Sequence, residues 1–195
     1  MSTVNWRDPR YLERGTPRQQ SAFADIQALG VLTSLAEFDP VLVSTVNLDI
    51  DIPSSDLDII CEAHDLVAFE VRVLDLFGGL RGFRSRRSES CTAAVVVSFF
   101  HGEWEYEIFA QAIPVEQQRA FQHLVQTHRV VTRGGDRWRS ALRFLKEQGL
   151  KTEPAVAHAL RLKGDPYDAV LALENVADEA LDAFLAVPPR VDLAS

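Results

Sequence analysis

The sequence lacks any uninterrupted apolar run that could cross a bilayer, which takes about 20 residues. Its first residues also lack the apolar centre of a signal peptide. Cysteine is scarce: Cys61 and Cys91, each at the end of an apparent strand, favour buried thiols in a reducing compartment over a disulfide framework. We therefore predict a cytoplasmic protein with no membrane partner, and we rank a nucleophilic Cys61 as a minor alternative.

Positive charge is in deficit, since 20 Lys and Arg residues face 28 Asp and Glu residues for a net charge of −8. This balance disfavours broad binding to nucleic acid, because such affinity comes mostly from neutralising phosphates. Arginine nevertheless concentrates in two clusters, which reflect either general use of arginine at the surface or local phosphate binding. The clusters are Arg81, Arg84, Arg86 and Arg87, then Arg129, Arg133, Arg137, Arg139 and Arg143.

The length of 195 residues and the 47% hydrophobic content suit one well-buried core. We predict a single domain over residues 1–195 with two lobes. Residues 11–112 are expected to form a mixed core and residues 113–190 a helical lobe. No repeat or low-complexity segment divides the sequence.

Helical and strand patterns alternate in the first 110 or so residues. A capping box at Thr16 and Gln19 opens a helix whose apolar face runs to Leu35. A short buried strand is expected over 40–45 and a helix over 63–77, which Gly78 and Gly79 end. After an arginine-rich loop, residues 91–100 and 104–109 are expected to form a hairpin.

The last third of the sequence reads as helical scaffold. A helix opens after Pro114 and carries His123 and His128, whose five-residue spacing does not share one helical face, so both are interpreted as structural or exposed. Gly134 and Gly135 are expected to interrupt this pattern before a further helix. Short helices are expected over 154–162, 166–173 and 177–185.

The most informative stretch is the segment 54–60, where Asp56 and Asp58 alternate with apolar residues. On a strand, residues two apart project from the same face, so these carboxylates would point together while Leu57 anchors the strand in a core. Hard divalent cations bind oxygen ligands placed in this way. A lone Asp-x-Asp triplet is a weak signal, since most are solvated, but here a buried strand ending in Ser44 and Thr45 precedes it.

Two other acidic patterns compete with this pair. Asp49 and Asp51 also alternate with apolar residues, and an exposed strand or loop face is the more economical explanation. On the expected strand over 104–109, Glu105 and Glu107 share a face with Glu103, and any of the three could reach a metal. Taken alone, an ordinary solvent-facing strand explains these three glutamates better.

Together these motifs resemble the nucleotidyltransferase superfamily typified by DNA polymerase beta. Its members pair a Gly-Ser turn at a strand end with an Asp-x-Asp strand, and a later strand supplies a third carboxylate. Ser44 stands at the glycine position and Thr45 at the serine position, so the turn departs from the pattern. A wider series resembles a small bacterial family of unassigned function that is grouped with these transferases. The series is Tyr11-Leu12, Gly15–Gln20, Ser54–Cys61, Glu107–Gln111, Ile113–Gln118 and Gly164–Tyr167.

The resemblance implies an α+β fold, in which a nucleotidyltransferase-like mixed β-sheet is flanked by helices and followed by a helical C-terminal extension. Asp56, Asp58 and Glu107 would be the catalytic and metal-binding carboxylates for one or two Mg²⁺ ions, with Glu105 in reserve for Glu107. A nucleoside triphosphate would donate its nucleotide to an unknown acceptor hydroxyl.

The resemblance also implies contacts to the triphosphate from Ser44 and Thr45, and from one of several arginines. The arginine candidates are Arg84, Arg86, Arg87, Arg129 and Arg137. The main alternative is a noncatalytic binding or regulatory protein that keeps this fold, and the missing glycine at position 44 favours it slightly. A toxin-like or antitoxin-like transferase that modifies a protein or transfer RNA would share the chemistry and differ in its acceptor.

Overall fold

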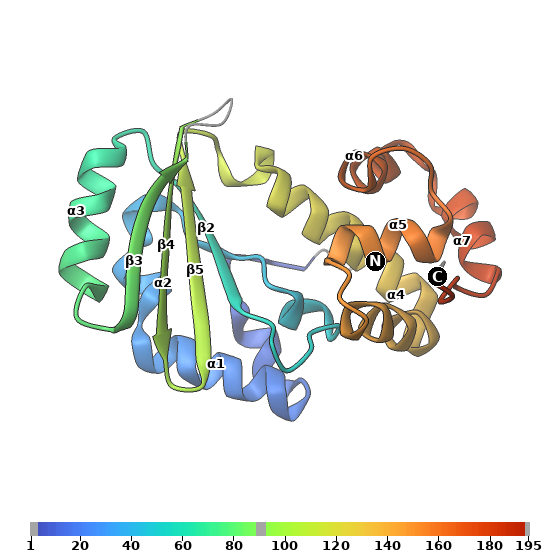
Figure 1. The fold of residues 1–195 in the computed structure, drawn as a ribbon, viewed down its shortest axis with the longest axis horizontal. Helices are drawn as coiled ribbons and strands as arrows, with labels where there is room; N and C mark the ends of the chain where they lie inside the picture. Colours follow the sequence, from blue (N-terminus) through green and yellow to red (C-terminus); the bar gives the residue numbers. More distant parts are fainter. Residues whose placement is uncertain (1–3, 89–92, 194–195) are drawn as a thin grey trace. The chain divides into compact units, whose positions relative to one another are not determined.

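A mixed sheet of five strands lies within the described residues of the computed structural model, which are 4–88 and 93–193 (Figure 1). The strand order is β1-β2-β5-β4-β3. Strands β2 and β5 pair in parallel, and the other neighbours are antiparallel. The strands are β1 (Val41–Leu42), β2 (Leu57–Glu62), β3 (Arg81–Ser88), β4 (Ala94–His101) and β5 (Trp104–Gln111). Cys91 lies outside the described residues.

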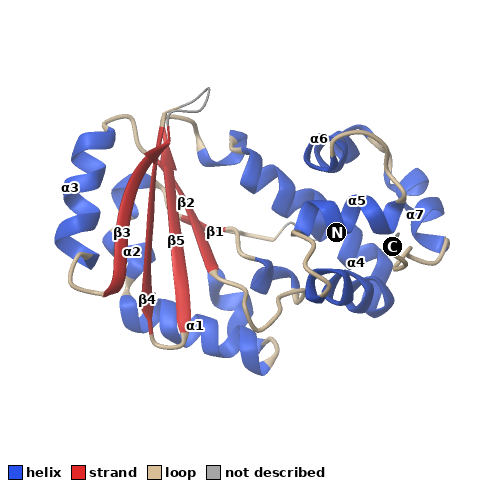
Figure 2. Ribbon diagram, viewed as in Figure 1, coloured by secondary structure: helices blue, strands red, loops and turns tan. Residues whose placement is uncertain are grey.

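The chain forms two compact units. The first contains Met1–Asn47 and Ser55–Gln118 and holds the sheet, and the second contains Leu48–Ser54 and Arg119–Ser195. The predicted α+β class, a mixed sheet flanked by helices with a helical C-terminal region, is confirmed (Figure 2). None of the helices in the described ranges is long and apolar enough to cross a membrane.

Helices of the first unit share one hydrophobic core with the sheet. They are α1 (Pro17–Leu29), α2 (Val31–Ser34) and α3 (Leu66–Phe77). Ile26 of α1 and Phe69 of α3 are buried in the same cluster as Val97 of β4 and Ile108 of β5. The predicted capping box at the start of α1 is present, but α1 ends at Leu29 rather than continuing to 35, because the next residue is a glycine in the left-handed conformation. Short 3₁₀ helices are η1 (Pro9–Arg14), η2 (Ala36–Phe38), η3 (Thr45–Leu48) and η4 (Val115–Gln117).

The hairpin predicted from the alternating residues is formed by β4 and β5, with His101 opposite Trp104. Along β5, Trp104, Tyr106, Ile108 and Ala110 are buried, and the residues between them are half-buried. The prediction of an arginine-rich loop before the hairpin was wrong, because residues 81–88 form the edge strand β3. Its side chains are mostly exposed, so the sequence shows no apolar alternation, and its backbone is held by pairing with β4.

The second unit is helical. It contains α4 (Arg119–Glu147), α5 (Thr152–Leu160), α6 (Pro166–Leu171), η5 (Ala172–Asn175) and α7 (Asp178–Ala186). The break expected at Gly134 and Gly135 is a kink within α4, where Gly135 has φ 66° and ψ −160°. Trp138 of α4 is 1% exposed, and its indole N–H donates to the carbonyl of Leu185 at 3.1 Å, which fixes the end of α7 against α4.

Candidate functional site

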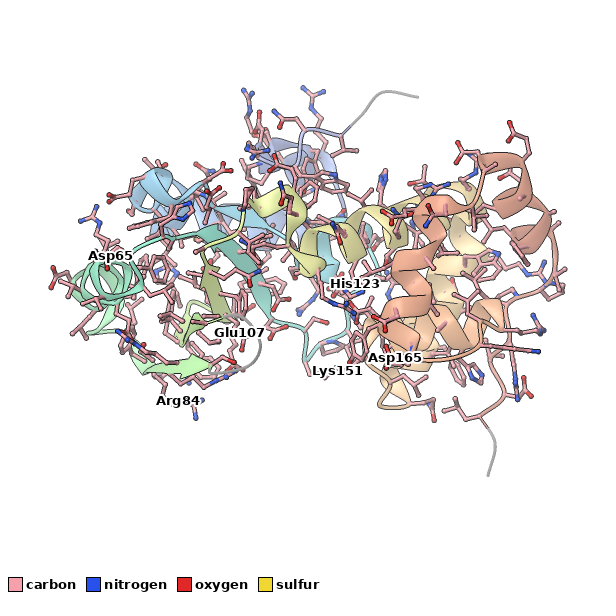
Figure 3. The ribbon with its side chains drawn as sticks, turned by 90° about the horizontal axis from the view of Figure 1, so that it is seen from above. Asp65, Arg84, Glu107, His123, Lys151 and Asp165 are labelled. Carbon is pink, nitrogen blue, oxygen red and sulfur yellow. The ribbon has the colours of Figure 1, made fainter. Side chains whose placement is uncertain are left out.

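Two carboxylates lie side by side on neighbouring strands of the parallel pair β2 and β5. Asp58 is the register partner of Glu107, and neighbouring strands are about 4.8 Å apart. Register partners project from the same face, and both residues are half-buried. Asp56 lies one residue before β2, and Glu105 lies two residues before Glu107 on β5. The register therefore places Glu107, rather than Glu105, directly opposite Asp58 (Figure 3 labels Glu107).

The core fixes which face of β2 carries Asp58. Leu57, Ile59 and Cys61 alternate with it along the strand, and each is 0% exposed in the core cluster. A one-residue slip would bury the carboxylate and expose these apolar side chains, so the register is strongly specified. The Cys61 thiol is free, as predicted, and burial raises its pKa, which disfavours the nucleophilic role.

The turn before β2 is held by Ser44. Its hydroxyl donates to the carbonyl of Asp56 at 2.6 Å, accepts from the backbone N–H of Val46 at 3.4 Å, and is fully buried. Thr45 begins η3 and is half-buried, with its hydroxyl 3.5 Å from that of Ser55. Ser44 therefore positions the backbone at Asp56, and Thr45 is the more accessible of the two hydroxyl residues.

An arginine lies in the same row of the sheet as the two carboxylates. Glu107 of β5 is opposite Ser98 of β4, and Ser98 is opposite Arg84 of β3. The row thus runs Asp58, Glu107, Ser98, Arg84 on one face (Figure 3 labels Glu107 and Arg84). Negative charge at one end of this row gives way to positive charge at the other, which suits a ligand that carries a metal-bound phosphate.

The remaining arginines of β3 separate by face. Arg86 is opposite Val96 and lies on the face of Arg84, because the two are two residues apart. Arg87 is opposite Val95, a residue of the core face, and its Nε donates to Glu70 of α3 at 2.9 Å. The structure therefore brings Arg84 and Arg86 to the carboxylate face and does not bring Arg87 there.

The two arginine candidates of the second unit differ in their surroundings. Arg129 donates to the carbonyls of Leu173 and Val176 at 2.8 Å each and to Asp178 at 2.9 Å. This hydrogen bond lowers the pKa of Asp178. Arg137 is exposed on α4. Arg129 thus joins α4 to the following segments of its unit.

The competing acidic pair lies in a loop of the second unit rather than on a strand. Arg143 donates to the carboxylate of Asp49 at 2.8 Å and to the carbonyl of Asp51 at 3.3 Å, and Lys146 donates to the carbonyl of Ile50 at 3.1 Å. The alternation at Asp49 and Asp51 therefore belongs to a loop that Arg143 and Lys146 hold in place. Arg143 was a phosphate candidate only as part of a basic cluster, and no sequence signal pointed to this contact.

The donor set fits Mg²⁺. Within residues 4–88 and 93–193, no three His, Cys, Asp or Glu residues form a ready-made metal cluster. Mg²⁺ commonly takes only one or two protein carboxylates and completes its octahedron with water and substrate phosphates. The opposed carboxylates of Asp58 and Glu107, with Asp56 nearby in sequence, can supply that number of oxygen ligands.

The chain is distantly similar to two solved structures. No curated protein sequence matches the chain. The Cid1 poly(U) polymerase bound to MgGTP is 14% identical over 79% of this chain and 48% of that one, with a TM-score of 0.46. The polymerase core of TRAMP, an RNA surveillance complex, is 10% identical over 90% of this chain and 58% of that one, also with a TM-score of 0.46. The chain thus spans about half the length of these structures.

A family model matches most of the chain. It covers residues 24–173, which include the five strands and all of α4, α5 and α6, and its description is "Domain of unknown function (DUF4269)". The candidate carboxylates and the arginines of β3 all fall inside the matched region. The chain belongs to the DUF4269 family.

Proposed function

We propose that this protein is a Mg²⁺-dependent nucleotidyltransferase that moves a nucleoside monophosphate from a nucleoside triphosphate to an acceptor hydroxyl. The single observation that carries the proposal is the β2–β5 register, which sets Asp58 opposite Glu107. Asp56, held through its carbonyl by Ser44, completes the set of carboxylates.

The chain's own residues would divide the work as follows. Asp56, Asp58 and Glu107 would hold the metal ion and orient the triphosphate, and a carboxylate oxygen of Glu107 would also accept the proton of the acceptor hydroxyl. The acceptor oxygen then forms a bond to the α-phosphorus, the bond from that phosphorus to the bridging oxygen breaks, and pyrophosphate leaves. When bound, Mg²⁺ supplies positive charge that stabilises the attacking and leaving oxygens.

Phosphate contacts would come from the same face of the sheet. Arg84 shares the carboxylate row, so we place it on the triphosphate, and Thr45 offers a hydroxyl at the start of η3. Arg86 is level with the apolar residues Val96 and Phe109 rather than with the carboxylates. Within the second unit, the donors of Arg129 are already engaged, and Arg137 is exposed on α4.

Calorimetric titration tests the proposal. ATP, GTP, CTP and UTP are each titrated into the protein with Mg²⁺ or with chelator, and the titrations are repeated with the Asp56→Asn and Asp58→Asn double variant. The proposal predicts Mg²⁺-dependent binding of at least one nucleotide that the double variant loses while its circular dichroism is unchanged. Glu103→Gln, at an exposed carboxylate of the β4–β5 turn, is the matched control and should keep binding. Unchanged binding in the double variant would refute the proposed metal site.

A noncatalytic protein of the same fold is the second candidate. Ser44 is fully buried at the position where the nucleotidyltransferase superfamily has glycine, and its hydroxyl is engaged with the backbone, so this hydroxyl is not available to a phosphate. This candidate predicts nucleotide binding that is indifferent to Mg²⁺, or no binding to any of the four nucleotides in the same titrations.

A further inference from the structure

A bulge in β3 brings a third arginine onto the carboxylate face. Arg81 is opposite Phe100 and Arg84 is opposite Ser98, so three steps along β3 match two steps along β4. The extra residue lies at the bulge that contains Gly82, which has φ 71°. Without it, residues three apart would point to opposite faces. With it, Arg81 and Arg84 share a face.

Arg81, Arg84 and Arg86 thus form a line of cations along the edge strand. All three are exposed. Arg81 and Arg86 are five residue steps apart along the strand, a span of roughly 15 Å. One phosphate group cannot contact cations spread over that length, whereas a chain of phosphodiesters can.

An aromatic ring lies beside this line of charge. The guanidinium of Arg81 is stacked over the ring of Phe100, 4.1 Å from its centroid. Nucleic-acid bases stack on aromatic rings and on guanidinium planes, which makes a stacked pair beside a row of cations typical of surfaces that bind single strands. Phe100 is two residues from Ser98, so this stacked pair neighbours the carboxylate row on the same face.

We propose that Arg81, Arg86 and Phe100, here called the β3 track, bind the phosphodiester backbone and a base of a single-stranded nucleic acid, while Arg84 contacts the donor triphosphate. The assignment of that strand as the acceptor rests on the proposed nucleotidyl transfer, while the binding itself does not. The net charge of −8 fits this assignment, because it confines nucleic-acid binding to a local surface. The terminal hydroxyl of the strand would lie toward Glu107, and its backbone would run along β3.

Protection of an exposed sheet edge would also favour charged side chains on β3. That role places no requirement on which face each arginine occupies. Arg87 supplies the matched control, because it lies on the same strand and carries the same charge but is on the opposite face, paired with Glu70. If substitution of Arg87 leaves oligonucleotide affinity unchanged while substitution of the arginines of the β3 track lowers it, the track binds the ligand and does not merely protect the sheet edge.

The test is fluorescence anisotropy with labelled single-stranded RNA and DNA of about 12 nucleotides, measured across a range of salt concentrations. The Arg81→Gln and Arg86→Gln double variant should weaken binding and reduce the slope of log affinity against log salt by about 1.4, since each phosphate contact to a single strand contributes about 0.7. Arg87→Gln should leave both the affinity and the slope of the native protein unchanged.

Equal losses in Arg87→Gln and in the double variant, or no binding of either oligonucleotide to the native protein, would overturn the proposed track. Nucleotide titrations of the same proteins keep the two proposals apart. If Mg²⁺-dependent nucleotide binding persists while oligonucleotides fail to bind, the β3 track is refuted and the transferase stands. If oligonucleotides bind through the track but no nucleotide binds, the β3 track is supported as a binding surface, and the assignment of the strand as the acceptor is refuted. A double variant that loses nucleotide as strongly as oligonucleotide would assign these arginines to the donor, against the inference.

Discussion

Replacing Gly82 with alanine should strongly destabilise the first unit. An L-residue in the left-handed region costs about 1–2 kcal/mol, and Gly82 has φ 71°. A Cβ at this position would lie 2.9 Å from Cδ2 and 3.2 Å from Cε2 of Phe100, and such overpacking typically costs about 1–3 kcal/mol. The reduced entropy of the unfolded chain returns about 0.4–1 kcal/mol. These contributions combine to about 1–4.6 kcal/mol, and we expect a net loss near the middle of that range, about 3 kcal/mol, in the free energy of unfolding.

Urea denaturation followed by circular dichroism measures this loss, with Gly79→Ala as the control. A Cβ at Gly79 meets nothing within 4 Å, and Gly79 has no positive φ, so alanine there should be neutral or stabilising by up to about 1 kcal/mol. Gly82→Ala should also weaken oligonucleotide binding, because the bulge aligns Arg81 with Arg84. Equal denaturation midpoints for the two variants would refute the assignment of the bulge.

Three further predictions concern other parts of the molecule. Arg143→Met should lower the free energy of unfolding by about 1–2 kcal/mol in urea denaturation, because it removes three hydrogen bonds from Arg143 to the loop of Asp49 and Asp51. Arg137→Met, on the exposed face of α4, should change this free energy little. In a Cys91→Ser background, burial and the raised pKa of Cys61 should prevent reaction with Ellman's reagent at mildly alkaline pH until urea unfolds the protein; prompt reaction of the native protein would contradict this. The hydrogen bond from Arg129 lowers the pKa of Asp178 below its ordinary 3.8. The ionised Asp178 therefore stabilises the folded protein above pH 3.8, and this stabilisation disappears as the pH falls through the pKa that Asp178 has in the folded state. The difference in stability between the native protein and Asp178→Asn should shrink accordingly on acidification, and a difference that does not depend on pH would count against the ion pair.

The faces of the central strands could be predicted from the sequence because they follow directly from alternation. Leu57, Ile59 and Cys61 alternate with Asp58 along β2 and define its core-facing side, and a similar alternation defines β5. The hairpin turn at Gly102 then fixes the β4–β5 register, which makes Ser98 the partner of Glu107. Ser98 could therefore have been identified as a member of the row from the sequence, had the register been counted back from the turn.

The partners of β2 and the nature of β3 could not be predicted in the same way. The pairing of Asp58 with Glu107 is a parallel contact between strands far apart in sequence, which no local pattern encodes. The edge strand β3 is largely exposed on both faces, so its sequence resembles a polar loop, and its conformation is set by pairing with β4. The role of Ser44 was also hidden, because its hydroxyl bonds to a backbone carbonyl twelve residues away.

We propose that Asp58 and Glu107 together hold a divalent cation, and electron paramagnetic resonance of bound Mn²⁺ is the sharpest test of this site. Mn²⁺ replaces Mg²⁺ at oxygen sites, and the measurement is made with a nonhydrolysable nucleoside triphosphate present. Asp58→Asn and Glu107→Gln should each abolish bound Mn²⁺, whereas Glu105→Gln, on the same strand and face but displaced from Asp58 by two residues, should retain it. Retention of Mn²⁺ by Glu107→Gln with loss by Glu105→Gln would contradict the site described by the β2–β5 register.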